Sequence, residues 1–245
     1  MDTLQEAFAS PEQKRRYVRK LFSTIADRYD FITVVLSFGR DAAWKRRLAR
    51  EALITQGQHV IDLACGTGDI ALEASRWGAT VTGLDLTPRM VQLARIKALR
   101  FKAEGGWPIP VFVVGDMMAL PFEAASADVI TTGYGLRNVP RLEDALDEIV
   151  RVLKPGGRLL SLDFNRPRSV LIQKPYLAYL TAVGSALGWV LHRDPDTYRY
   201  IPESVRRYPG AHGVAELLRS RGFDEVRIVP LFFGFMTLHV ATRKR

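Results

Sequence analysis

The chain has 245 residues, 47% of them hydrophobic and 25% charged, which is ordinary for a globular protein and excludes extensive disorder. Its single cysteine, Cys65, excludes an internal disulfide, and the sequence offers no ligand cluster for a metal ion. The net charge of +9 comes from the two ends, since residues 1–50 carry 11 Lys and Arg against 6 Asp and Glu, and residues 190–245 carry 10 against 6.

The charge and hydropathy patterns bear on the cellular location of the protein. Basic ends suit solvated surface, anionic lipid headgroups or nucleic acid. Residues 1–16 contain no apolar segment of a secretory signal, and their mixture of acids and bases argues against a transit peptide. The longest apolar stretch, residues 177–191, is shorter than the roughly 20 residues of a spanning helix. We therefore expect a cytoplasmic protein that is soluble or peripheral at the inner face of the membrane.

The first predicted element is a mostly helical segment over residues 12–47. Five side chains fall on one helical face: Leu21, Phe22, Ile25, Ala26 and Tyr29. This face is expected to pack against the rest of the protein. At its end, Tyr29 and Asp30 could close over a ligand, and packing with helix capping explains the same pair equally well.

A buried strand over residues 58–63 then leads into a glycine turn and a helix over residues 68–76. Gly66 and Gly68 let the backbone turn sharply and approach a ligand where a Cβ would collide. This turn is typical of proteins that bind a nucleotide-bearing cofactor, but it also satisfies the relaxed dinucleotide pattern. The turn alone therefore does not identify the cofactor.

Carboxylates follow the first three predicted strands. Asp62 ends the first strand and could hold an ammonium group, which nicotinamide cofactors lack. Asp85, followed by Leu86, ends the second strand in a position to accept hydrogen bonds from ribose hydroxyls. After the third strand, Asp116 could accept a hydrogen bond from an adenine amino group, with Met117 against the ring. Together these residues resemble the S-adenosylmethionine site of class I methyltransferases, which we favour over an NAD site.

Strands and helices alternate along the chain, which predicts an α/β fold with one mostly parallel, doubly wound sheet and helices on both faces. Seven strands are predicted, over residues 58–63, 79–84, 110–115, 128–133, 158–164, 225–231 and 235–242. Helices are predicted over residues 68–76, 87–100, 142–153 and 214–221. The last two strands form a hairpin through Gly234, so that the final strand is reversed, as in class I methyltransferases.

An insert over residues 166–212 separates the fifth strand from the C-terminal part. It is rich in aromatic side chains: Tyr176, Tyr179, Trp189, Tyr198, Tyr200 and Tyr208. Ligands of open α/β sheets bind beyond the carboxyl ends of the strands, so this insert and the N-terminal segment are natural lids. Its apolar part, residues 177–191, suits docking at a bilayer surface or a plain buried helix.

Several segments resemble the ubiquinone/menaquinone biosynthesis C-methyltransferases. They are residues 25–30 (IADRYD), 36–39 (LSFG), 44–45 (WK), 134–139 (YGLRNV), 151–158 (RVLKPGGR) and 198–205 (YRYIPESV). Segments 134–139 and 198–205 are the discriminating ones, whereas segment 151–158 is shared by many methyltransferases. The similarity covers residues 14–243, which is nearly the whole chain.

This resemblance implies one methyltransferase domain over residues 1–245. Its expected parts are an N-terminal helical lid (12–47), a cofactor-binding core (48–165), a substrate cap inserted after the fifth strand (166–212) and a C-terminal helix and hairpin (213–245). It also implies S-adenosylmethionine contacts at Thr67 in the turn, at Asp85 on the ribose, and at Asp116 and Met117 on the adenine. At Gly133 family members often have Ser, so that contact is missing or is made by backbone or water.

The resemblance implies carbon methylation of a polyprenyl hydroquinone, a lipophilic substrate whose ring carbon attacks after a neighbouring phenol loses its proton. Demethylmenaquinol is the expected acceptor, and the 2-polyprenyl-6-methoxy-benzoquinol precursor of ubiquinone comes second. Arg137 is expected to fix the phenolate oxygen or to orient a water that takes the proton, and an Arg that merely pairs with a carboxylate is the alternative. Asn138 orients the same oxygen or caps the turn, Tyr29 closes over the site, and His192 could titrate near the acceptor.

Other functions use parts of the same pattern. Another small aromatic or lipid acceptor would need only a different cap. An RNA or DNA methyltransferase would suit the basic ends, but no Asn/Asp-Pro-Pro-aromatic element follows the fourth strand, so no nucleic acid partner is expected. An NAD-dependent reductase would lack its Tyr-x-x-x-Lys pair and leave Asp62 unexplained, and a non-catalytic S-adenosylmethionine-binding regulator would have no need of Arg137. Peripheral contact with a membrane and a homodimer are both compatible with the family.

Overall fold

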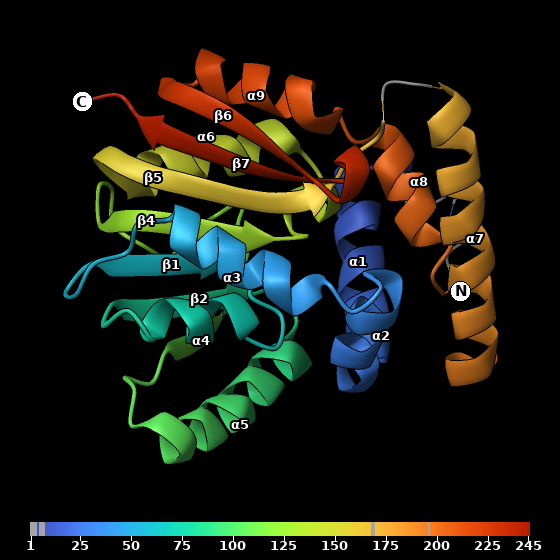
Figure 1. Ribbon diagram of the computed structural model, residues 1–245, viewed down its shortest axis with the longest axis horizontal. Helices are drawn as coiled ribbons and strands as arrows, with labels where there is room; N and C mark the ends of the chain where they lie inside the picture. Colours follow the sequence, from blue (N-terminus) through green and yellow to red (C-terminus); the bar gives the residue numbers. More distant parts are fainter. Residues whose placement is uncertain (1–3, 5–7, 168–169, 196) are drawn as a thin grey trace.

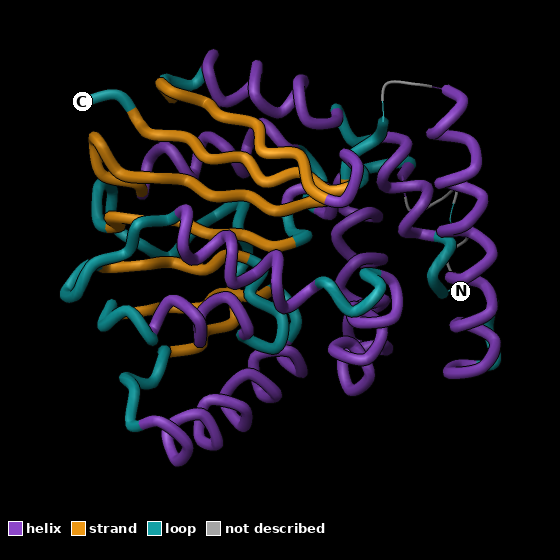
Figure 2. Tube along the Cα trace, viewed as in Figure 1, coloured by secondary structure: helices purple, strands orange, loops and turns teal. Residues whose placement is uncertain are grey.

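Seven strands form one twisted sheet in the order β3-β2-β1-β4-β5-β7-β6 (Figure 1, Figure 2). The computed structural model describes residues 4, 8–167, 170–195 and 197–245. The strands are β1 (His59–Leu63), β2 (Thr80–Asp85), β3 (Val111–Val114), β4 (Ala127–Gly133), β5 (Leu153–Phe164), β6 (Phe223–Leu231) and β7 (Met236–Arg243). Neighbouring strands pair in parallel except at β7, which is antiparallel to both β5 and β6. The predicted mostly parallel sheet with a reversed final strand is confirmed.

Helices cover both faces of the sheet and gather beyond the carboxyl ends of its parallel strands. They are α1 (Pro11–Ile25), α2 (Tyr29–Leu36), α3 (Asp41–Glu51), α4 (Asp69–Ser75), α5 (Pro88–Gly105), α6 (Leu142–Val152), α7 (Val170–His192), α8 (Tyr200–Arg207) and α9 (Gly210–Ser220). Short 3-10 turns in the described residues are η2 (Ala26–Arg28) between α1 and α2, η3 (Leu136–Asn138) between β4 and α6, and η4 (Phe232–Gly234) between β6 and β7. In Figure 1, α1, α2, α7 and α8 stand together at one end of the sheet.

The hydrophobic core explains why β1, an inner strand of the sheet, is a nearly continuous apolar run. Val60 packs in a cluster with side chains of α3, α4 and α5 on one face of the sheet. Ile61 and Leu63 pack with side chains of α6 and α9 on the other face. All three residues are fully buried, since helices cover both faces. The exception to this apolar run is Asp62, which is buried to the same extent.

Two element boundaries differ from those predicted. β5 begins at Leu153 rather than at residue 158, because Leu153 pairs with Ala127 before the register shifts and Arg158 pairs with Val129. The segment over residues 154–157 therefore interrupts the pairing of a strand instead of preceding it. α9 begins at Gly210 rather than at residue 214, within the segment predicted to be the cap.

The N-terminal and inserted segments contact each other beyond the sheet. The ring of Phe38, after α2, stacks on Tyr179 of α7 with centroids 5.2 Å apart. The ring of Tyr17 on α1 meets Tyr200 of α8 at 5.5 Å. The two segments thus pack against each other beyond the carboxyl edge of the sheet. In the part of the chain that the structure describes, none of the helices combines the length and hydropathy needed to span a membrane.

Candidate active site

Three adjoining cavities lie between the carboxyl edge of the sheet and the lid segments. The apolar cavity has a volume of about 380 Å³ and is enclosed by α1, α2, α7, α8 and η4. The strand-end cavity of about 80 Å³ lies over the ends of β2, β3 and β4, and the turn recess of about 20 Å³ lies against the glycine turn. Tyr29 and Tyr134 line all three, so the cavities meet at this pair of tyrosines.

Asp85 lines the strand-end cavity at the end of β2. Its Oδ2 accepts a hydrogen bond from the Gly66 amide at 2.9 Å, and its Oδ1 accepts one from the Thr87 amide at 2.8 Å. Burial raises the pKa of the Asp85 carboxyl group, and the two amides offset part of this shift. Each carboxylate oxygen keeps a second lone pair, so Asp85 can still accept hydrogen bonds from a pair of hydroxyl groups. Leu86 lines the same cavity.

Asp116 and Met117 line the other end of the strand-end cavity. Asp116 Oδ1 accepts a hydrogen bond from the Met118 amide at 2.9 Å. Its Oδ2 lies 2.9 Å from Nε of Arg15, which belongs to α1 and lines the same cavity. The contact with Arg15 was not predicted, because only the fold brings α1 to this edge of the sheet. It attaches the N-terminal lid to the predicted adenine side of the cavity.

The glycine turn has the backbone conformation that the sequence predicts. Gly66 and Gly68 have φ values of +55° and +89°, in the left-handed region that favours glycine. A Cβ on Gly68 would lie 2.8 Å from the ring of Phe112, so this position also has no room for a side chain. The ring of Tyr29 lies over the turn, 3.5 Å from where a Cβ on Gly66 would be. Of the two glycines, Gly66 lines the strand-end cavity.

Thr67 and Gly133 occupy the turn recess. Thr67 donates a hydrogen bond to Oδ1 of Asp30 at 2.6 Å, which ties the start of α2 to the turn. Gly133 stands where family members often have Ser, and a Cβ there would lie 2.6 Å from Cδ1 of Ile70. The departure therefore has a steric reason, and a contact made here by backbone or water stays a prediction. Thr67 lines the recess and not the strand-end cavity.

Asp62 lies beneath the turn and is not among the residues that line the three cavities. It is fully buried, and Oδ1 accepts a hydrogen bond from the Thr131 hydroxyl at 2.8 Å. Burial raises the pKa of Asp62 to about 7, although the Thr131 hydroxyl lowers it in part. Oδ2 of Asp62 has no hydrogen-bond partner among the described residues, and the predicted contact between Asp62 and an ammonium group stays a prediction.

We expect Asp62 to make the stability of the ligand-free protein depend on pH. Because the folded-state pKa is raised to about 7, the native state holds this proton more tightly than the unfolded state does. The free energy of unfolding therefore falls as the pH rises from the ordinary pKa of an aspartate to about 7. Asp62→Asn removes the titration. The variant should therefore gain roughly 1–3 kcal/mol relative to the parent protein between about pH 5 and about pH 8, as measured by urea denaturation. A difference that stays constant with pH would contradict the raised pKa.

The segment 134–139 folds around the carbonyl oxygen of Tyr134. Tyr134 has a φ of +62°, which is rare for a residue with a bulky side chain. Its carbonyl accepts hydrogen bonds from Nη1 of Arg137 at 3.0 Å and from Nδ2 of Asn138 at 2.7 Å. Asn138 therefore caps the turn, and it lines the strand-end cavity rather than the apolar one. Its predicted contact with the acceptor ring stays a prediction.

Arg137 lines the apolar cavity, and it also forms a buried ion pair. Nη1 lies 2.9 Å from Oδ1 of Asp163 at the end of β5, and the guanidinium lies 4.7 Å from the ring centroid of Phe164. Burial alone would lower the pKa of Arg137, but Asp163 more than offsets this and keeps the guanidinium charged. Arg137 thus pairs with a carboxylate and also lines the cavity, and its expected role toward the acceptor stays a prediction. Its Nε has no hydrogen-bond partner among the described residues.

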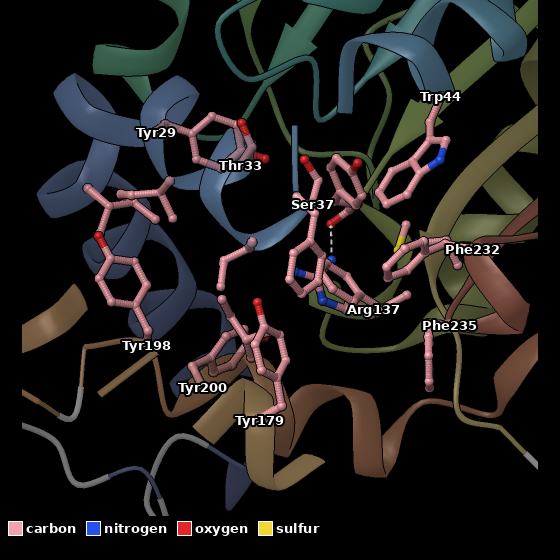
Figure 3. A pocket seen from close by; sticks show the side chains of 18 of the residues that line it. Tyr29, Thr33, Ser37, Trp44, Arg137, Tyr179, Tyr198, Tyr200, Phe232 and Phe235 are labelled. Carbon is pink, nitrogen blue, oxygen red and sulfur yellow. Dashed lines mark hydrogen bonds between the residues drawn. The ribbon is translucent and has the colours of Figure 1, made fainter. Parts of the chain in front are cut away.

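Aromatic side chains from four segments line the apolar cavity (Figure 3). They are Phe22, Tyr29, Phe38, Trp44, Tyr134, Phe164, Tyr176, Tyr179, Tyr198, Tyr200, Phe232, Phe233 and Phe235. The Tyr200 hydroxyl is buried and has no hydrogen-bond partner within the described part of the chain. Sequence patterns did not indicate the residues of η4, because an apolar tip of a hairpin has no periodicity of its own. His192 does not line this cavity, and its Nε2 lies 2.9 Å from the Tyr198 hydroxyl.

We compared the chain with known protein families and with known proteins. The ubiE/COQ5 methyltransferase family model matches residues 10–243. The chain belongs to the ubiE/COQ5 methyltransferase family. It is 37% identical to a ubiquinone/menaquinone biosynthesis C-methyltransferase of Rubrivivax gelatinosus, over 94% of this chain and 88% of that protein. It is 39% identical to a demethylmenaquinone methyltransferase of Thermus thermophilus, over 91% of this chain and all of that protein.

The solved structures that resemble the chain agree with the family in fold. A SAM-dependent methyltransferase from Thermotoga maritima superposes with a TM-score of 0.66 at 20% identity, over 93% of this chain and 100% of that one. The predicted family and the class I methyltransferase fold are therefore confirmed. The chain is an S-adenosylmethionine-dependent methyltransferase. These comparisons indicate no nucleic acid partner.

Proposed function

We propose that this ubiE/COQ5-family protein methylates a ring carbon of a polyprenyl hydroquinone and that its acceptor is demethylmenaquinol. The observation that carries the proposal is the apolar cavity of about 380 Å³, which meets the strand-end cavity at Tyr29 and Tyr134. A lipophilic ring held there would adjoin the cofactor. Relatives named for ubiquinone and menaquinone biosynthesis, and for demethylmenaquinone alone, support a quinol as the class of acceptor.

The polar atoms of the apolar cavity support a hydroquinone ring. Nε of Arg137 and the hydroxyl of Tyr200 are both buried without a partner among the described residues. A buried polar group without a partner costs about 1–3 kcal/mol, which a ligand oxygen would recover. The demethylmenaquinol head group carries two oxygens on a fused apolar ring, whereas the benzoquinol precursor carries an additional methoxy oxygen. The predominantly aromatic lining therefore favours the naphthoquinol.

Arg137 has the central role in the proposed chemistry. S-adenosylmethionine, when bound, supplies an electrophilic methyl group. A ring carbon becomes nucleophilic when the neighbouring phenol gives its proton to water, and the charged guanidinium of Arg137 would stabilise that phenolate among the aromatic side chains of the cavity. As this carbon takes the methyl group, S-adenosylhomocysteine is the leaving group, and the proton of the methylated carbon would pass to water and restore the aromatic ring. Tyr29 and Tyr134 would hold the ring in line with the methyl group, since they stand where the cavities meet. Asn138 keeps the Tyr134 carbonyl in place.

A methyl-transfer assay with two acceptors tests this function. Purified protein and labelled S-adenosylmethionine are incubated in detergent with reduced demethylmenaquinone or with the reduced benzoquinone precursor, and the products are analysed by mass. We expect a carbon-bound methyl group on the naphthoquinol, with kcat/KM at least roughly tenfold above that for the benzoquinol. A preference for the benzoquinol would overturn the choice of acceptor. Cofactor binding without a product from either acceptor would overturn the quinol class.

We further propose that the protein takes its acceptor from an anionic bilayer through α7. The described side chains of this helix that are exposed form one stripe along it. They are Leu171, Lys174, Pro175, Ala178, Ala182, Ala186, Trp189 and Val190, and the lysine is the only charged residue among them. Trp189 and Val190 are each 67% exposed. Phe38 and Phe233, which line the apolar cavity, are also exposed, so the cavity has an apolar rim. Such a surface suits the headgroup region of a membrane better than water.

Trp189→Glu tests the bilayer contact. The substitution places a carboxylate on the exposed stripe, so cosedimentation with vesicles of phosphatidylglycerol and phosphatidylcholine should fall by roughly tenfold. Methylation of a short-tailed quinol in detergent should change by less than about twofold, because Trp189 lines none of the three cavities. Thr24→Glu on the exposed side of α1 is the matched control. Equal vesicle binding by the parent protein and both variants would exclude this surface.

A further inference from the structure

The turn recess has two charged residues in its lining, Lys45 and Asp69. It shares Tyr29, Ala64, Gly66, Gly133 and Tyr134 with the strand-end cavity, so the two spaces are continuous. A cofactor whose adenosine lies over Asp85 and Asp116 must place its amino-acid end at one side of this cavity. The recess lies on the side of the glycine turn, away from Asp116 and Met117, which line only the strand-end cavity.

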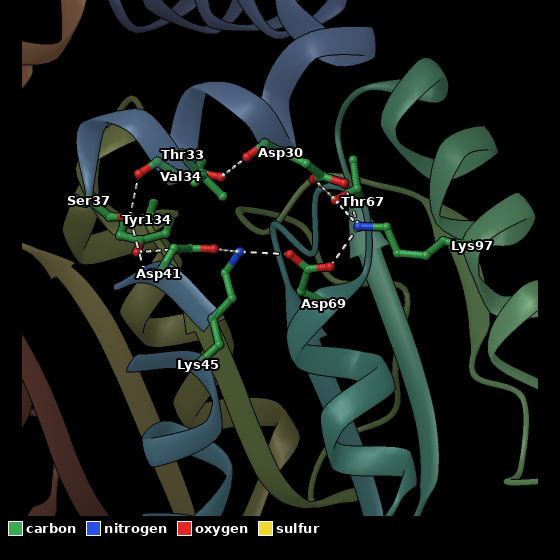
Figure 4. Close-up of polar contacts among 10 residues, drawn as sticks. All are labelled: Asp30, Thr33, Val34, Ser37, Asp41, Lys45, Thr67, Asp69, Lys97 and Tyr134. Atoms are coloured by element: carbon green, nitrogen blue, oxygen red, sulfur yellow. Dashed lines mark hydrogen bonds and ion pairs between the residues drawn. The ribbon is translucent and has the colours of Figure 1, made fainter. Parts of the chain in front are cut away.

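Lys45 of α3 points into a polar network below the lid (Figure 4). Its side chain is 9% exposed, and Nζ lies 2.6 Å from Oδ2 of Asp41 and 2.9 Å from Oδ2 of Asp69. Burial lowers the pKa of Lys45, but Asp69 and Asp41 more than offset this, so the ammonium stays charged. An ammonium has three N–H donors, and the two carboxylates take two of them. One donor of Lys45 thus stays available for a ligand in the recess.

Asp69 supplies the complementary charge. Its Oδ1 accepts a hydrogen bond from Nζ of Lys97 at 2.6 Å, and its Oδ2 accepts one from Lys45. Burial raises the pKa of Asp69, but Lys45 and Lys97 lower it to about 2, so the group is a carboxylate at neutral pH. Its side chain is 32% exposed, and each oxygen keeps a lone pair for another donor.

We propose that Lys45 and Asp69 bind the amino-acid end of S-adenosylmethionine, Lys45 through the ligand carboxylate and Asp69 through the ligand ammonium. A zwitterion that meets a lysine and an aspartate leaves the net charge of the recess unchanged, so neither partner has to change its protonation state. Asp69 thereby takes the place that the sequence predicted for Asp62, which lies beneath the turn and lines none of the cavities. The assignment rests on the cofactor and is independent of the acceptor.

The network also couples this end of the cofactor to the acceptor side. Asp41, the second partner of Lys45, accepts a hydrogen bond from the Tyr134 hydroxyl at 2.7 Å. Tyr134 lines the apolar cavity as well as the recess. If a ligand carboxylate in the recess shifts the Lys45 ammonium, the Asp41 carboxylate that pairs with it would shift as well. The hydrogen bond from Tyr134 to Asp41 would then change the position of the tyrosine ring, against which the acceptor packs. Lys45 is therefore a binding residue whose loss affects the position of Tyr134.

The test compares two ligands that differ only at the proposed contact. S-adenosylhomocysteine has the amino-acid end, and 5′-methylthioadenosine lacks it. For Lys45→Met we expect isothermal titration calorimetry to show a loss of S-adenosylhomocysteine affinity of roughly 10- to 100-fold, because a charge-assisted hydrogen bond is removed. The affinity for 5′-methylthioadenosine should change by less than about threefold, which also shows that the variant is folded.

Arg89→Met is the matched control. Arg89 on α5 also pairs with the lid, through Asp27, but it lines none of the three cavities, so neither affinity should change by more than about threefold. Equal losses for both ligands in Lys45→Met would overturn the assignment, and so would unchanged affinity for S-adenosylhomocysteine. If Lys45→Met does not fold, the affinities for the same two ligands are measured on Asp69→Asn instead. A loss confined to S-adenosylhomocysteine then supports the proposal, and any other pattern overturns it.

Discussion

Arg137→Ala is expected to lower kcat by roughly 10²- to 10³-fold while the affinity for S-adenosylhomocysteine stays within about threefold. The reason is geometric, since Arg137 lines the apolar cavity and not the strand-end cavity. Its guanidinium is desolvated and stays charged beside Asp163, so it would stabilise a developing phenolate far more strongly than an exposed arginine. The measurement is a steady-state assay with reduced demethylmenaquinone, together with calorimetric titration of the cofactor product.

The same substitution leaves Asp163 buried without its partner, which costs about 3–5 kcal/mol of stability. Arg137→Ala combined with Asp163→Asn removes the unpaired charge. This double variant should recover most of the lost Tm and keep the low kcat, so chemistry and folding are separated. Arg141→Ala is the surface control, since Arg141 is exposed and pairs with Asp144 outside the cavities. A double variant with restored kcat would show that Arg137 is purely structural.

Asp85→Ala is expected to weaken the binding of S-adenosylmethionine by roughly 10²- to 10³-fold. Asp85 would lose two charge-assisted hydrogen bonds to the ribose, each contributing about 1.5–3 kcal/mol. The amides of Gly66 and Thr87 would lose their acceptor as well, so the glycine turn would no longer be held to the end of β2. Calorimetric titration measures the loss, and kcat at saturating cofactor should fall much less than kcat/KM for the cofactor.

Asp128→Ala is the matched control for Asp85. Asp128 is also in the sheet and also accepts a hydrogen bond from a backbone amide, that of His59 at 2.8 Å. It lies near the start of β4, at the opposite edge from the cavities, and should leave cofactor affinity within about twofold. Comparable losses in the two variants would mean that Asp85 acts through general stability and not through the ribose.

The residues at the end of β4 show what local sequence can predict. The motif over residues 134–139 indicated a functional turn, and the structure explains its composition, since Arg137 and Asn138 both donate to the Tyr134 carbonyl. The pairing of Arg137 with Asp163 could not be predicted, because the partner lies on another strand. Asp62 shows the limit of such local reasoning. A carboxylate at the end of a strand predicted a ligand contact, and the fold buries it against the Thr131 hydroxyl, so that contact stays a prediction.

The sequence by itself determined the α/β class, the succession of strands and helices along the chain and the position of the glycine turn, because these depend on the apolar runs of buried strands and on the positive φ values that glycine permits. It also determined which strand ends carry carboxylates. Only the tertiary structure decided the order of the strands in the sheet and which of these carboxylates line a cavity. The apolar cavity forms where segments distant in sequence meet, and Lys45 reaches the turn from α3. Such contacts depend on how helices pack on the sheet, and no local pattern encodes that packing.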